Sequence, residues 1–174
     1  GGREALIEAG SPLNLMGRFY VDRHGPIYGN ALHASVFMDK MNAIKNLTLG
    51  QDHLNDKIVA SSETKCLNFS PILLSIAIAG DQIQIFKTLL AHGAIFDTSD
   101  LVTLRKALEN MILFENVQIL DTIVKQRKID LYDPIDNKGL IFLNLIRSTT
   151  KQKIQNWLTR NKQWILQNNP KVLL

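Results

Sequence analysis

The stretch that decides the fold is Ile85-Phe86-Lys87-Thr88-Leu89-Leu90-Ala91-His92-Gly93-Ala94. Its apolar residues recur at the spacing i, i+1, i+4 and i+5, which places them on one stripe of a helix. Gly93 follows at the point where a helix ends, because glycine adopts the left-handed backbone conformation without a steric penalty. The stretch therefore predicts a short helix with one apolar face and a defined end.

The same apolar pattern recurs along the chain at Ile44–Leu47, Ile119–Val124 and Ile154–Leu158, and the tail of another copy lies at Leu6–Asn14. Each full copy is preceded by another short helical stretch, at residues 31–38, 72–80, 104–114 and 141–149. The turns between the two helices are polar: Asp39-Lys40, Asp81-Gln82, Glu115-Asn116 and Thr150-Lys151. Asp and Asn there are expected to cap the second helix of each pair.

Three motifs in these units resemble the ankyrin repeat family. Asn30–Val36 resembles its Thr-Pro-Leu-His-x-Ala-Ala helix start, Leu89–Ala94 its Leu-Leu-x-x-Gly-Ala ending, and Asp136–Gly139 its Asp-x-x-Gly loop. Aligned first-helix starts at positions 30, 72, 106 and 141 are 42, 34 and 35 residues apart, close to the family period of about 33. The longer first spacing places extra residues within 51–69.

The sequence also departs from the family pattern. His33 is the only histidine at its position in the units, and Ser75 and Asn144 replace it in two others. Their short polar side chains are expected to bond the backbone of the neighbouring loop. The third unit ends in Lys125–Lys128 without its glycine, and residues 15–29 are predicted to form a long loop.

We therefore predict an all-α fold, an ankyrin-repeat solenoid of about four helix-turn-helix units with a partial N-terminal repeat and a C-terminal capping helix. Residues 3–174 are expected to form one domain, divided into a partial repeat at 3–14, units near 30–50, 70–96, 101–128 and 139–162, and a cap at 163–170. Because the chain opens on the last helix of a repeat, we expect a fragment of a longer protein. The stacked units should bury one continuous core, with these side chains inside: Leu32, Ile44, Leu47, Ile76, Ile85, Leu89, Leu108, Ile119, Ile123, Leu143, Ile154 and Leu158.

Composition gives a weaker indication of function. Hydrophobic residues make up 45% of the chain and charged residues 21%, as in soluble globular proteins. There is no apolar run of 18 residues and no signal-peptide pattern at the start. The net charge is +4, and the basic cluster of Lys125, Arg127 and Lys128 is interpreted as a solvated helix end, not a nucleic-acid surface.

Chemical motifs do not favour an enzyme. The four histidines lack metal-ligand spacing, and there is no glycine-rich phosphate loop, so no catalytic residue, metal site or cofactor is predicted. Cys66 is the only cysteine. It is either a stray loop thiol, the favoured interpretation, or the nucleophile of an enzyme.

The resemblance places partner contacts at loop tips and late in each first helix. There Phe37, Met38, Leu113 and Phe114 are apolar where the family usually has polar residues. They form either an exposed interface or part of the core. The early stretch with Arg18, Phe19, Tyr20 and Arg23 is the second candidate surface, because aromatic residues and arginine are enriched at interfaces, or it simply packs on the first repeat.

The leading hypothesis is a monomeric protein-interaction module that binds a protein partner, with no nucleic acid or membrane involved. Degenerate ankyrin repeats of this kind resemble those of secreted effectors of intracellular bacteria. That resemblance implies a host protein as partner and a location in the cytoplasm or a host cytosol. Alternatively, the repeats position or regulate a catalytic domain outside this chain.

Overall fold

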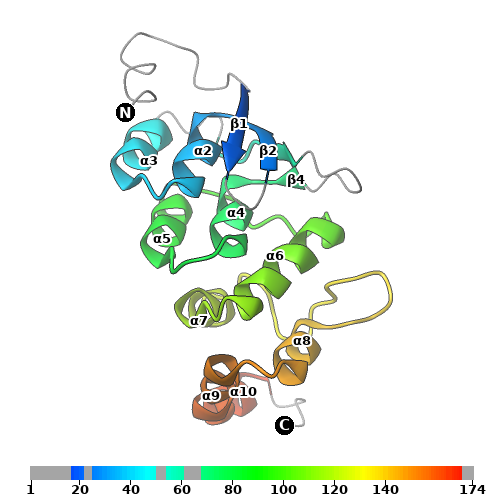
Figure 1. The fold of residues 1–174 in the computed structure, drawn as a ribbon. Coiled ribbons are helices and arrows are strands. Elements are labelled where there is room, and N and C mark those ends of the chain that lie inside the picture. The colour runs from blue at the N-terminus through cyan, green and yellow to red at the C-terminus, as the bar shows by residue number, and fades with distance from the viewer. Residues whose placement is uncertain (1–16, 22–24, 50–53, 61–67, 170–174) are drawn as a thin grey trace.

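The computed structural model describes residues 17–21, 25–49, 54–60 and 68–169, with residues 17–21, 25–28 and 58–60 described by their backbone alone (Figure 1). This part of the chain is mostly helical, as predicted. It also contains a four-stranded sheet near its N-terminal end, so the expectation of helices alone is corrected. The predicted partial repeat at 3–14 lies outside the described residues.

The helices form successive pairs. The first helices of the pairs are α2 (Ala31–Phe37), α4 (Pro71–Ala77), α6 (Leu101–Leu113) and α8 (Phe142–Ser148). The second helices are α3 (Met41–Thr48), α5 (Ile83–Ala91), α7 (Val117–Lys125) and α9 (Gln152–Arg160), and α10 (Lys162–Asn168) follows the last pair. We call these two sets the first-helix row and the second-helix row.

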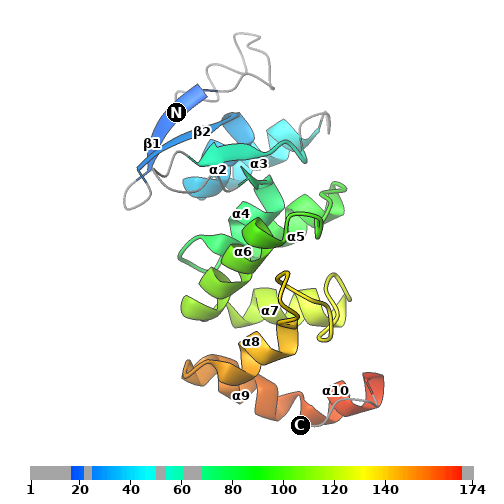
Figure 2. The same ribbon diagram turned by 90° about the vertical axis from the view of Figure 1, so that its right-hand side faces the viewer.

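Each pair packs on the next in chain order. In the first-helix row α2 contacts α4, and α4 contacts α6; in the second-helix row α3, α5, α7 and α9 contact one another in turn. The two rows descend side by side through the molecule, and both views show the same order from the N-terminal sheet to α10 (Figures 1 and 2). A helix pair thus buries its apolar face against its neighbours in the chain.

The starts of three first helices differ from the predicted ones. α4 begins one residue and α6 three residues before the stretches predicted at 72 and 104, and α8 begins one residue after the stretch predicted at 141. Asp100 caps α6 because its carboxylate accepts from the Thr103 backbone N–H at 3.1 Å and from the Thr103 hydroxyl at 2.7 Å. The second helices are more regular, since they begin 42, 34 and 35 residues apart.

The polar turns work differently from the prediction. In the second helices α3, α5, α7 and α9, the residue at the N-cap position makes no capping hydrogen bond with its side chain. Instead, Asp39 and Glu115 take the left-handed conformation, both with φ of 55°, and end the first helices α2 and α6. The amides of Glu115 and Asn116 return to the carbonyls of Ile112 and Met111, both at 3.0 Å. This is the Schellman arrangement, which satisfies the carbonyls at the end of the first helix.

The predicted N-terminal loop is in fact a β-hairpin. Strand β1 (Gly17–Val21) pairs antiparallel with β2 (Gly25–Gly29), and β3 (Ile58–Ala60) and β4 (Asn68–Phe69) extend the sheet in that order. The third and fourth strands lie within the extra residues predicted between the first two units. The sheet therefore covers the beginning of the helical stack.

The core follows the predicted apolar stripes. Eleven of the twelve residues expected inside are buried, and Leu158 is partly buried against the same core. The core also continues into the loop between α7 and α8, which we call the third loop, through the buried side chains of Ile129, Leu131 and Ile135. One connected cluster thus runs through all four pairs.

His33 holds the start of α2. Its Nδ1 accepts from the Asn30 backbone N–H at 3.1 Å, while its backbone N–H donates to the Asn30 side chain at 3.0 Å. Its Nε2 lies 2.9 Å from the Asp56 carbonyl and therefore carries the proton. Asn144 repeats the helix-start contact, because its side-chain oxygen accepts from the Ile141 backbone N–H at 3.2 Å. Ser75 does not, since its hydroxyl donates to the carbonyl of Ile72 in its own helix. The expected contacts of Ser75 and Asn144 with neighbouring loops are absent from the described hydrogen bonds.

Candidate interaction surface

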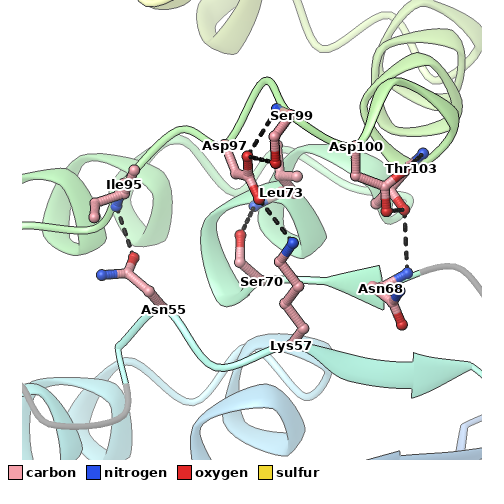
Figure 3. Close-up of polar contacts among 10 residues, drawn as sticks. All are labelled: Asn55, Lys57, Asn68, Ser70, Leu73, Ile95, Asp97, Ser99, Asp100 and Thr103. Carbon is pink, nitrogen blue, oxygen red and sulfur yellow. Dashed lines mark hydrogen bonds and ion pairs between the residues drawn. The ribbon is translucent and has the colours of Figure 1, made fainter.

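The loop between the first and second helix pairs contacts the loop between the second and third pairs. The Lys57 ammonium lies 2.7 Å from the Asp97 carboxylate, and the Asn55 side chain accepts from the Ile95 N–H at 2.7 Å (Figure 3). The first of these loops precedes α4 and the second follows α5. These two contacts hold the loop before α4 against the loop after α5.

Asp97 is stabilised in its charged form. The hydrogen bond from Lys57 and those from the Ser99 hydroxyl and backbone N–H lower the pKa of the Asp97 carboxyl to about 2. The same pairing raises the pKa of Lys57. The pair therefore remains ionised across the neutral range and acts as a loop clamp.

The third loop is organised by Asp136. One carboxylate oxygen accepts from the backbone N–H groups of Lys138 and Leu140 at 2.8 and 2.9 Å, and these bonds lower the pKa of Asp136. The other oxygen accepts from Arg105 of α6 at 3.0 Å. Arg105 also donates to Glu109 at 2.6 Å. The loop is thereby connected to the first-helix row.

An open groove of about 360 Å³ lies between α6 and α8. These two helices pack less closely than α4 and α6, which leaves the space between them. Arg105 and Glu109 line the groove from α6, and Lys151 lines it from the turn after α8. The hydroxyls of Ser148 and Thr149 belong to the same lining. The apolar part of the lining comes from Ile112, Leu113 and Leu145. We call this the α6–α8 groove.

The third unit contributes the most exposed of the predicted apolar pairs. Leu113, at the end of α6, lines the groove and is 52% exposed, and Phe114, the next residue, is 39% exposed. Both remain accessible because they lie where α6 ends in its left-handed turn. The choice left open by the sequence is thus decided for these two residues in favour of exposure.

The first unit behaves differently. Phe37 is partly buried and packs against the core, whereas Met38 is 51% exposed. Their helix α2 is separated from α6 by α4, so this pair does not join the α6–α8 groove. Arg18, Phe19 and Tyr20 lie in β1, where the backbone alone is described. Arg23 lies outside the described residues.

Sequence reasoning missed most of the polar lining of the groove. Arg105, Glu109 and Ile112 are four and three residues apart on α6, so they share a face with one another. That periodicity is visible in the sequence. What the sequence does not contain is the distance between α6 and α8, which decides that this face is open.

Other chemical sites are not apparent in the described residues. Within 17–21, 25–49, 54–60 and 68–169, no three His, Cys, Asp or Glu side chains gather in a way that could hold a metal ion. No helix there is long and apolar enough to cross a bilayer. Cys66 lies outside the described residues, so the choice between a stray loop thiol and a nucleophile is not tested.

The chain matches no protein-family model, no characterised protein and no solved structure. Its function is therefore inferred from its own residues.

Proposed function

We propose that this chain is a protein-interaction module built from ankyrin-like helical repeats, and that it binds a segment of a partner protein in the α6–α8 groove. The observation that carries the proposal is the exposure of Leu113 and Phe114 beside an open groove with a mixed apolar and charged lining. Large apolar side chains at such a position favour burial by a partner. The stacked pairs and the regular spacing of the second helices support the repeat architecture.

The apolar residues at the groove and the charged residues that line it have different roles in this proposal. Leu113 and Phe114 act as anchors, because burying a large apolar side chain contributes on the order of 1.5–3 kcal/mol. Arg105 is already oriented by Glu109 and Asp136, so it presents a fixed donor at the edge of the groove. Fixed polar groups select among partners more than they add affinity.

The proposal is tested by comparing two apolar-to-acid variants in affinity purification followed by binding of the purified partner. Leu113→Glu places a charge in the groove, whereas Leu49→Glu places the same charge on a residue that is 77% exposed at the end of α3. A partner recovered with the wild type should be lost with Leu113→Glu and retained with Leu49→Glu. Loss of the direct interaction by at least about tenfold is expected.

Thermal unfolding of each variant separates binding from folding. Leu113→Glu should leave the melting temperature close to that of the wild type, because the side chain is half-exposed. Retention of every partner by a folded Leu113→Glu/Phe114→Glu variant would contradict the proposal. Equal loss with the folded Leu49→Glu protein would contradict it as well.

A further inference from the structure

A second groove lies on the other row of helices. It is an open depression of about 470 Å³ that crosses α5, α7 and α9. Its lining includes Lys87 of α5, Lys125 of α7 and Arg160 of α9, and the indole of Trp157. Figure 1 shows these three helices following one another along the side of the molecule opposite α6 and α8. We call it the α5–α9 groove.

The lining of this groove is basic. Asp121 is its one acidic residue, and it is already engaged. The Asp121 carboxylate lies 2.9 Å from the Lys125 ammonium and accepts from the Trp157 indole N–H at 3.0 Å. No acidic partner faces Lys87 or Arg160 in the described part of the chain. Two cations are therefore left available to an outside ligand.

The three cations are spread over three successive helices. Neighbouring packed helices lie about 8–10 Å apart, so the cations cover roughly 20 Å. An extended peptide rises about 3.3 Å per residue, so about six residues cross this distance. A short segment with several carboxylates can therefore reach from Lys87 to Arg160.

The environment favours carboxylates over a nucleic acid. Binding of single strands relies on exposed aromatic faces on which the bases stack. Here Trp157 is buried, and the Trp164 ring has the Lys125 ammonium over it at 6.0 Å from its centre.

We propose that the α5–α9 groove binds an extended acidic segment of a partner protein, whose carboxylates pair with Lys87 and Arg160 on either side of the Lys125–Asp121 ion pair. This surface lies on the second-helix row and is separate from the α6–α8 groove. The two proposals can therefore fail independently, because variants of the α5–α9 groove test this one and Leu113→Glu tests the α6–α8 groove.

The experiment measures binding of a fluorescein-labelled peptide of about eight glutamates by anisotropy, a length that spans the groove. The Lys87→Gln/Arg160→Gln variant removes the two lining cations that have no ion-pair partner among the described residues. The control, Lys106→Gln/Lys138→Gln, lowers the net charge equally on exposed residues of α6 and the third loop. Both tryptophans of the chain lie beside this surface, so intrinsic fluorescence provides a second measurement.

We expect the wild-type protein to bind the peptide, and we expect the groove variant to bind it about tenfold more weakly. The control variant should retain the wild-type affinity, and added salt should lower the affinity. A peptide of glutamines should not bind. Equal weakening by both variants would assign the binding to net charge and overturn the proposal. Absence of binding, or tighter binding of an oligothymidylate of matched charge, would overturn it too.

Discussion

Several helices in this chain end at a residue in the left-handed backbone conformation. Gly93 does so at the end of α5 with φ of 97°, and Arg127 does so at the end of α7 with φ of 53°. In both turns the amide of the left-handed residue and the amide that follows it donate to the last carbonyls of the helix. The third unit has Arg127 where the second has Gly93, so its turn keeps the same hydrogen bonds but holds a non-glycine residue in a strained conformation. A side chain in this conformation costs about 1–2 kcal/mol.

We predict that Arg127→Gly stabilises the protein by about 0.5–1 kcal/mol, because relief of the strained backbone exceeds the added entropy of the unfolded chain. Gly93→Ala should destabilise by about 1 kcal/mol for the converse reason. A Cβ at Gly93 meets no atom within 4 Å, so the cost there comes from the backbone alone. Urea unfolding measures both changes. Destabilisation by Arg127→Gly would show that its bond to Asn168 at 3.2 Å outweighs the strain.

His33 makes the stability depend on pH. Burial lowers the pKa of its imidazole from 6.5 to about 4, because the charged form is poorly solvated there. The unfolded chain therefore binds a proton near pH 6.5, and the folded chain does so only near pH 4. Stability is complete above pH 6.5 and falls as the pH decreases toward 4, by about 3 kcal/mol in total.

The measurement is urea unfolding at pH values between about 7 and 4.5. His33→Gln should be less stable at neutral pH, since it loses the bonds to Asn30 and Asp56, but its stability should vary less over this range. An unchanged pH dependence in His33→Gln would assign the effect to other groups.

At the scale of elements, the helices could be predicted because their apolar stripes repeat with the helical period. The start of α6 could not, because Asp100 caps a turn that the ankyrin-like spacing does not include. The hairpin at 17–29 was missed for a different reason. Its residues include Phe19, Tyr20 and Tyr28, which favour strands, but the repeat pattern led to their interpretation as a loop.

The candidate site could be predicted in part. Leu113 and Phe114 were identified from their apolar character at positions that are usually polar. Phe37 satisfied the same rule and packs against the core. The difference depends on how far the neighbouring helices stand apart, which is a property of the packed stack and not of any one repeat.

Leu89 tests the packing of one element. It is fully buried in α5, and Leu90 beside it is partly exposed. Leu89→Ala should cost about 2–5 kcal/mol because it leaves a cavity between helices. Leu90→Ala should cost about 1 kcal/mol or less. Equal losses in urea unfolding would show that the two side chains are not divided into core and surface as described.

At the scale of the whole molecule, the helices contact mainly their neighbours in the chain. Polar contacts follow the same rule, since Gln82 donates to the Val36 carbonyl of the preceding pair and Glu115 accepts from the Lys153 amide of the following one. The stability of such a stack is close to a sum of local and nearest-neighbour contributions. A defect at one end should therefore weaken that end first.

Ile154→Ala tests this consequence. Ile154 is fully buried in α9, so its truncation should loosen the last pair and α10 while α2 and α3 keep their protection. Ile44→Ala, equally buried in α3, should produce the opposite distribution. Hydrogen exchange resolved by peptide measures both patterns. Uniform loss of protection from α2 to α10 in either variant would mean that the four pairs unfold as one cooperative unit, because nearest-neighbour coupling would then exceed the stability of any single pair.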